Sequence, residues 1–218
     1  MSEVRGKDLS RTRVLDAAMA LVDREGLERL TMRRLGQELG VEAMSLYHYV
    51  ASKQELLDAL VEHAIGEIEL PPPDEAWDVQ LRLLAHQFRQ VGLRHPGVAS
   101  LFGTRALRSV SAFAPLERSF SLLRAQGVPP EAAVDAVVTL AAFVFGYVLV
   151  ELGGLRELAT GRSVDFGVVG AAGHHELAEL GAVLAAREPD EQFRHGVRLI
   201  VSAIGALVSR SAPLASDA

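Results

Sequence analysis

The sequence predicts an all-α protein with a short N-terminal part and a longer C-terminal part. In most segments the apolar residues recur at steps of three and four, which is the period of one helix face. No segment shows the period-two alternation of apolar and polar residues that a half-buried strand would carry. Capping residues, glycines and prolines stand where these periodic segments begin and end, so they set the expected element boundaries.

The composition indicates a folded chain, with 218 residues, 49% of them apolar and 23% charged. The absence of cysteine excludes a disulfide framework, a thiolate metal site and a cysteine nucleophile. The first residues lack the apolar core of a secretory signal. The longest uncharged apolar stretch, 136–150, is shorter than the about 20 residues of a membrane span. We therefore expect a cytoplasmic protein without a membrane partner, in which this stretch is a buried helix.

The first two helices are marked by their ends. Residues 9–25 carry apolar side chains on one face, and Gly26 follows where a helix-ending glycine would stand. Thr31 is a suitable N-cap for a second helix that ends near Gly40. Leu30 and Leu35 flank that cap as a hydrophobic staple. A third short helix is expected over 42–49.

A capping box opens the fourth helix, with Ser52 as N-cap and Glu55 three residues later. This helix should carry its apolar face as far as Ile68 and stop before the prolines at 71–73. The Gly-rich stretch 153–173 is expected to be a loop. The remaining apolar periodicity predicts helices at 75–95, 97–102, 108–126, 130–152, 174–187 and 190–209.

Two short helices joined by a tight glycine-containing turn and preceded by an amphipathic helix are the parts of a helix-turn-helix. The second short helix has Leu46 as its one obvious core residue, and its other side chains offer hydrogen-bonding groups. Such a helix suits insertion into a DNA groove. The alternative is that Tyr47 and Tyr49 are ordinary core aromatics. The flanking Thr31, Arg33 and Lys53 favour the DNA-binding interpretation.

The segment LTMRRLGQELGVEAMSLYHYVASKQELLDAL resembles the DNA-binding part of the tetracycline-repressor (TetR) family. Its landmarks are a Thr-started helix, a Gly-Val turn, an LY-plus-aromatic recognition helix and an SK start to the fourth helix. Family members often carry His where this chain has Tyr49, so His48 is an alternative to Tyr49 in that role. The resemblance implies base-edge contacts from Arg33, Ala43, Met44 and Ser45, and phosphate contacts from Thr31, Tyr47, Tyr49 and Lys53.

The C-terminal part is similar, more weakly, to the ligand-binding and dimerisation domain of the tetracycline-repressor branch, in strings such as EAWDVQLRLLAHQF and RHPGVASLFGTR. Histidines help to hold a magnesium–antibiotic complex in that branch, and the matching positions here are Glu69 and Leu101. A leucine in place of an imidazole argues against metal–tetracycline. We expect no cofactor and no metal site. Candidate effector-lining residues, each of which could equally be ordinary core, are Leu84, Phe88, Leu101, Phe102, Phe113, Phe143 and Tyr147.

The stretch 136–150 is apolar on nearly all sides, and 190–209 carries a continuous apolar stripe. A helix that is apolar all round needs neighbours on both sides, of which we expect one to be its own domain and the other a second subunit. A homodimer would also place two recognition helices on a palindromic DNA site.

The expected organisation is a helix-turn-helix DNA-binding domain at 1–53, a connecting helix at 54–70 and an effector-binding and dimerisation domain at 71–218. The expected function is a homodimeric transcriptional regulator, a repressor released from its operator by a small, largely apolar effector. The alternative is a ligand-independent DNA-binding architectural or partner-recruiting protein. An enzyme is not expected, because the chain lacks the nucleophile, phosphate-binding and paired-acid motifs of enzymes.

The net charge of -6 would by itself speak against nucleic acid. The charge is unevenly distributed, with +1 over residues 1–53 and -7 over 54–218. Residues 29–53, which include the expected reading surface, carry +2. The acidity therefore belongs to the C-terminal part, where it would discourage DNA from binding anywhere but at the helix-turn-helix.

Overall fold

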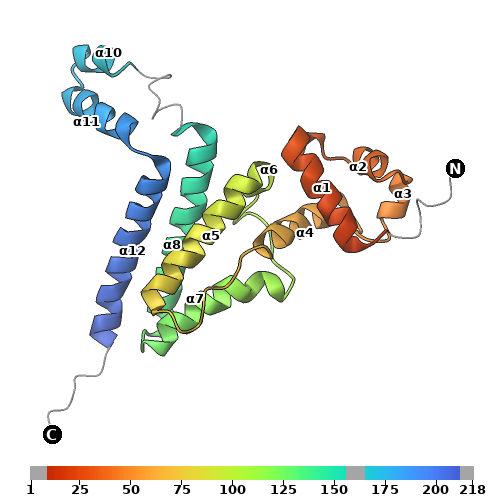
Figure 1. The fold of residues 1–218 in the computed structure, drawn as a ribbon, viewed down its shortest axis with the longest axis horizontal. Coiled ribbons are helices and arrows are strands. Elements are labelled where there is room, and N and C mark those ends of the chain that lie inside the picture. Colours follow the sequence, from red (N-terminus) through yellow and green to blue (C-terminus); the bar gives the residue numbers. More distant parts are fainter. Residues whose placement is uncertain (1–8, 156–164, 212–218) are drawn as a thin grey trace, which may run out of the picture. The chain divides into compact units, whose positions relative to one another are not determined.

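The computed structural model describes residues 9–155 and 165–211 (Figure 1). Every regular element within these residues is a helix, so the predicted all-α fold class is confirmed. The N-terminal elements are α1 (Arg11–Glu25), the short 3-10 turn η1 (Leu27–Arg29), α2 (Met32–Leu39), α3 (Ala43–Leu46) and α4 (Lys53–Ile65).

The predicted caps of the first helices are present. The hydroxyls of Thr31 and Ser52 accept the backbone N–H three residues on, at 3.1 and 3.0 Å. Glu55 returns its carboxylate to the N–H of Ala51 at 2.7 Å, which completes a capping box one residue earlier than the usual form. Gly40 ends α2 in the left-handed conformation, at φ 68°.

The third helix is shorter than expected, because it ends at Leu46 rather than Tyr49. The N–H groups of Tyr47, His48 and Tyr49 each bond to the carbonyl three residues before, so the chain tightens into turns there. The fourth helix also ends early, at Ile65, before Gly66.

The remaining elements follow the sequence expectation with two corrections. The helix expected from 108 begins only at Ala114, after the 3-10 turn η2. The loop expected over 153–173 contains the short helix α10, whose N-cap Asp165 accepts the N–H of Gly167 at 2.9 Å. Residues 156–164 of that loop lie outside the described chain.

The elements after α4 are α5 (Trp77–Arg94), α6 (Pro96–Ala99), η2 (Ser111–Phe113), α7 (Ala114–Ala125), α8 (Pro130–Val150), the π-helical η3 (Glu151–Leu155), α10 (Phe166–Ala171), α11 (His175–Ala186) and α12 (Pro189–Ser211).

The chain divides into two compact units. The first, the head unit, comprises Met1–Pro71 and Gln87–Arg118, and the second, the C-terminal unit, comprises Pro72–His86 and Ser119–Ala218. The division passes through α5 and α7, so each of these helices contributes to both units. The head unit is centred on buried leucines of α1, α2, α3 and α4, which are Leu21, Leu35, Leu46, Leu56 and Leu60.

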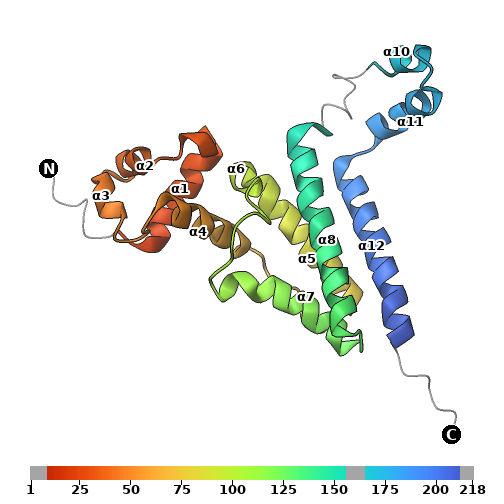
Figure 2. The same ribbon diagram turned by 180° about the vertical axis from the view of Figure 1, so that it is seen from behind.

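The core of the C-terminal unit lies between α8 and α12, which run side by side in both views (Figures 1 and 2). It contains Leu140, Val144, Phe193, Val197 and Val201, all buried. The sequence expectation that 136–150 is buried is met on this face alone, because the outer face of α8 is exposed within the single chain. By length and composition, Pro130–Gly153 is the one described stretch that could cross a membrane, with a mean hydropathy of 2.2.

Candidate DNA-binding surface and ligand sites

The residues expected to read DNA lie on the surface of the head unit, on α2, on α3 with its following turns, and at the start of α4. Met44 is 73% exposed and Tyr47 44% exposed, so Tyr47 is not a core aromatic. An apolar side chain exposed to this degree on a recognition helix can meet a thymine methyl in the major groove. The set divides into exposed side chains, which are Thr31, Arg33, Met44, Tyr47, His48 and Lys53, and half-buried ones, which are Ala43, Ser45 and Tyr49.

Two neighbouring arginines of α2 have different roles. Arg34 donates two hydrogen bonds to Glu25 of α1, at 2.6 and 3.2 Å, and lies 3.1 Å from Glu38. Arg24 bridges the same two carboxylates at 3.0 Å each. Hydrogen bonds from Arg34 and then Arg24 hold the pKa of Glu25 below its ordinary value. Arg33 has no ion-pair partner among the described residues, so its guanidinium is available for a ligand.

The start of α4 presents a second available cation. Lys53 is exposed and has no carboxylate within ion-pair distance in the part of the chain that the structure describes. It follows Ser52, whose hydroxyl accepts a hydrogen bond from the backbone N–H of Glu55 in the first turn of α4. The remaining donors and the positive end of the helix dipole favour an anion such as phosphate.

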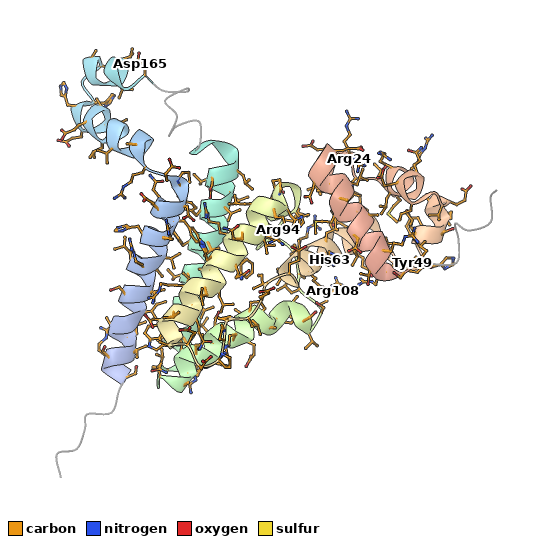
Figure 3. All side chains as sticks on the ribbon, viewed as in Figure 1. Arg24, Tyr49, His63, Arg94, Arg108 and Asp165 are labelled. Atoms are coloured by element: carbon orange, nitrogen blue, oxygen red, sulfur yellow. The ribbon has the colours of Figure 1, made fainter. Side chains whose placement is uncertain are left out.

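Tyr49 and His48 differ in how firmly they are held. The backbone carbonyl of Tyr49 accepts the Nε–H of Arg11 at 3.3 Å, and Arg11 also contacts Glu55 at 3.3 Å. Tyr49, labelled in Figure 3, is half-buried, whereas His48 is exposed. Both side chains stay candidates for the same DNA contact.

The turn between α2 and α3 depends on a close approach at Gly36. A Cβ atom there would lie 2.9 Å from the carbonyl oxygen of Val41 and 3.2 Å from the backbone nitrogen of Ala43. Any larger residue would push α3 away from α2, because both neighbours are backbone atoms. Gly36 therefore sets the position of α3 relative to α2.

Sequence reasoning missed a polar cluster around the buried His95 in the head unit. The imidazole of His95, just before α6, faces Asp23 of α1 through Nδ1 at 2.7 Å and Glu67 after α4 through Nε2 at 3.0 Å. Each ring nitrogen of His95 thus faces one carboxylate. Arg94 also contacts Glu67. Nothing in the local sequence around His95 indicates partners 28 and 72 residues away.

Close packing reinforces this junction. A Cβ atom on Gly97 of α6 would lie 2.4 Å from Cγ1 of Val22, a buried residue of α1. Glycine at this position allows α6 to lie directly against the helix that supports the recognition helix. The cluster and this contact together tie α1, α4 and α6 into one body.

The seven candidate effector residues fall into two groups, one in each unit. In the head unit, Phe88 and Phe102 pack edge to face with ring centroids 6.1 Å apart, and Phe113 is exposed. In the C-terminal unit, Phe143 and Tyr147 pack on Phe193 of α12. The Tyr147 hydroxyl donates to the carbonyl of Pro189 at 2.7 Å. Leu84 and Leu101 are buried.

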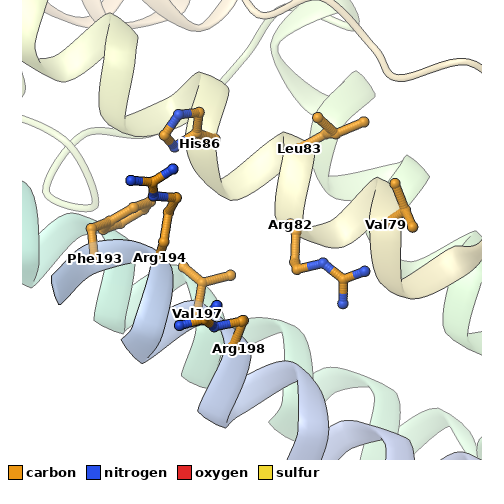
Figure 4. A pocket seen from close by; sticks show the side chains of 8 residues that line it. All are labelled: Val79, Arg82, Leu83, His86, Phe193, Arg194, Val197 and Arg198. Atoms are coloured by element: carbon orange, nitrogen blue, oxygen red, sulfur yellow. The ribbon is translucent and has the colours of Figure 1, made fainter. Parts of the chain in front are cut away.

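A separate groove lies between α5 and α12 within the C-terminal unit (Figure 4). Its volume is about 250 Å³. None of its residues belongs to the candidate effector set; they are Val79, Arg82, Leu83, His86, Phe193, Arg194, Val197 and Arg198. Over 9–155 and 165–211, no group of three or more His, Asp or Glu side chains is arranged so that it could hold a metal ion.

Comparison with known protein families gives two matches that together span most of the chain. Residues 14–60 match the bacterial regulatory proteins of the tetR family, and residues 70–208 match the tetracycline-repressor-like C-terminal domain. The chain belongs to the TetR family. TetR-family membership confirms the resemblance noted in the sequence, and it accounts for an N-terminal helix-turn-helix followed by a helical C-terminal domain.

Individual TetR relatives agree with this assignment. The chain is 34% identical over 140 residues to the transcriptional repressor DrrR1 of Streptomyces coeruleorubidus, a match covering 63% of this chain and 52% of that protein. It thus spans about half the length of that relative. The tetracycline repressor protein class A of Escherichia coli is 32% identical over 202 residues, covering 88% of each chain.

Among solved TetR-family structures, apo ActR of Streptomyces coelicolor is similar with a TM-score of 0.78 and 28% sequence identity. The match covers 94% of this chain and 98% of ActR. ActR has also been solved in complex with actinorhodin.

Proposed function

We propose that this TetR-family chain is a homodimeric transcriptional repressor that binds a palindromic operator and is released from it by a small molecule. The observation that supports the DNA-binding part is the difference in ion pairing between the two neighbouring arginines of α2. Arg34 forms ion pairs with Glu25 and Glu38. Arg33, and Lys53 at the start of α4, have no ion-pair partner among the described residues. Exposed cations without partners at the expected reading positions are what phosphate and base contacts require.

The homodimer is supported by an apolar stripe along the outer face of α8 and α12. Val138 is 56% exposed and Leu199 is 60% exposed. On α8 its members are four, seven and four residues apart, so they lie on one face of the helix. We define the apolar stripe as Val134, Val138, Phe145, Leu149 and Leu199. A second copy of the same face would remove this surface from water, which favours association.

The effector is the less constrained part of the proposal. DrrR1 is named a repressor and ActR has been crystallised with actinorhodin, which supports a repressor that responds to a small molecule. We propose that this effector is largely apolar. To weaken operator binding a thousandfold, it must favour the released state by about 4 kcal/mol. The protein would act in the cytoplasm and without enzymatic activity.

The test is selection of a binding site from random duplex DNA, followed by gel shifts with three variants. Arg33→Ala should relax the sequence preference, because it removes a base contact. Lys53→Ala should weaken binding to every duplex and lower the salt dependence, because it removes a phosphate contact.

Arg34→Ala is the matched control. It should lower the stability of the head and leave the sequence preference of the folded fraction unchanged, because this guanidinium is held by Glu25 and Glu38. Equal loss of sequence preference in all three variants would contradict the assigned roles. Failure of the wild-type chain to select any duplex would reject the function.

A further inference from the structure

The groove between α5 and α12 combines an apolar base with a cationic rim. Phe193 and Val197 on α12 are buried, and Val79 and Leu83 face them from α5. Four nitrogen-bearing side chains line the same groove from both helices, which are Arg82, His86, Arg194 and Arg198. Figure 4 shows Arg82 and His86 projecting from α5 toward α12, beside Arg194 and Arg198.

The rim carries more positive than negative charge. Arg82 pairs with Asp78 at 2.7 Å and Arg194 pairs with Asp190 at 2.9 Å, each within its own helix. Arg198 contacts the Nδ1 atom of His195 at 3.4 Å and has no carboxylate within 4 Å among the described residues. Three guanidinium groups thus face two carboxylates, which leaves one guanidinium for an anion.

Packing of α5 against α12 does not by itself require arginines around the groove. Exposed i,i+4 ion pairs contribute little to stability, so they do not explain why arginines from two helices gather around one hollow. A guanidinium binds a carboxylate through two parallel hydrogen bonds, and the apolar base would cover a hydrocarbon body. Inorganic phosphate would match the rim but leave Phe193 and Val197 in contact with water.

We propose that the α5–α12 groove binds a small organic carboxylate with an apolar body, held by Arg198 at its anionic end. A volume of about 250 Å³ fits a compact body, because pockets for drug-sized ligands begin near about 300 Å³. The groove shares no residue with the candidate effector set or with the apolar stripe. It is a second ligand site, and a ligand there joins α5 to α12.

The single tryptophan of the chain provides a direct readout. The ring of Trp77, at the start of α5, lies 3.9 Å from where a Cβ on Gly205 of α12 would stand. Its fluorescence therefore reports on the contact between the two helices that form the groove. The full chain is titrated with decanoate below its micelle concentration, with decanol and inorganic phosphate as comparisons, and calorimetry supplies a second readout that does not depend on Trp77.

Decanoate should bind at least about tenfold more tightly than decanol, a difference of about 1.4 kcal/mol. Phosphate at the same concentrations should not displace it. Arg198→Gln should weaken decanoate binding about tenfold without unfolding the chain, because this side chain is exposed and has no carboxylate partner in the part of the chain that the structure describes. The matched control is Arg187→Gln, an exposed arginine of the same unit outside the groove, which should bind decanoate like the wild type.

Equal binding of decanoate and decanol would overturn the proposal, as would wild-type affinity in Arg198→Gln or full displacement by phosphate. That the carboxylate acts as an effector rests on the proposed function, so operator binding is measured in the same samples. If the chain selects no DNA but binds decanoate through Arg198, the proposed function is wrong and the proposed ligand site in the groove is supported. If the chain binds its operator but shows no Arg198-dependent decanoate binding, only the proposed ligand site in the groove is wrong.

Discussion

The two units of the chain differ in how they use polar and apolar surface. In the head unit, long-range polar contacts join the elements, through Arg34 with Glu25 and through His95 with Asp23 and Glu67. In the C-terminal unit the helices meet mainly through aliphatic and aromatic side chains, and the outer face of α8 carries apolar side chains into solvent.

This difference shows which unit is complete as a single chain. The head unit satisfies its own polar groups and leaves exposed cations, which suits a polyanion such as DNA. The C-terminal unit leaves apolar surface, which suits a second copy of itself.

The largest effect is expected at the apolar stripe. Val138→Glu should weaken self-association by about a hundredfold or more, about 3 kcal/mol, because a carboxylate would be buried without a partner. Sedimentation over a dilution series measures the dissociation constant. Val110→Glu is the matched control, because Val110 is 89% exposed and lies outside the stripe. An unchanged dissociation constant in Val138→Glu would show that the stripe is not the dimer face.

The second effect concerns the polar cluster around His95 in the head unit. His95→Ala should lower the free energy of unfolding by about 2 kcal/mol, because it removes a buried side chain, leaves Asp23 without its described partner and leaves Glu67 with Arg94 alone. Chemical denaturation measures this loss. His63→Ala serves for comparison, because His63 has one described carboxylate contact, with Asp16 at 2.9 Å, and should cost less. Equal losses would mean that the bridging position of His95 adds nothing.

The third effect compares one substitution in both units. Gly97→Ala should cost about 2 kcal/mol, because its Cβ would meet the buried, β-branched Val22 at 2.4 Å. Gly196→Ala should cost less, although its Cβ would meet the ring of Phe143 at 2.3 Å, because that ring is only half-buried and can rotate away. Chemical denaturation of both variants measures the two losses in free energy of unfolding. In the double variant, Val22→Ala should recover part of the loss caused by Gly97→Ala. A larger loss for Gly196→Ala would contradict the argument.

The smallest effect is the acid sensitivity of the head. Arg34 and Arg24 lower the pKa of Glu25, so its contribution is fully present above the ordinary carboxyl pKa of 4.5 and is lost as the pH falls through the lower folded value. Glu25→Gln should therefore reduce the acid-induced loss of stability below pH 4.5. Thermal unfolding between neutral and acid pH measures it, with Glu28→Gln as the exposed control. Identical acid profiles for wild type and Glu25→Gln would refute this assignment.

The sequence was informative where the physics is local. The N-caps at Thr31 and Ser52 and the left-handed Gly40 all depend on residues within one helical turn, so their patterns predicted them correctly. The length of α3 was predicted wrongly because the choice between an α-helical and a tighter turn at Tyr47 is small in energy and depends on the surroundings.

The candidate site was predictable in part for the same reason. The thirty-residue TetR-like segment placed the expected DNA contacts on one stretch of chain, and the structure leaves all of them exposed or half-buried. The resemblance named Arg33 as the base-contacting arginine, but the local sequence gave no physical reason to prefer it to its neighbour Arg34. Only the position of Glu25 on α1 supplies that reason.

By itself, then, the sequence determined the helical fold class, the ends of the first helices and the TetR-like reading segment, because these depend on short-range periodicity and capping. Only the tertiary structure decided that His95 bridges Asp23 and Glu67, that Arg34 is occupied, and that α5 and α12 form a cationic groove. Those features join residues far apart in the chain, and chain folding, not local propensity, brings them within contact distance.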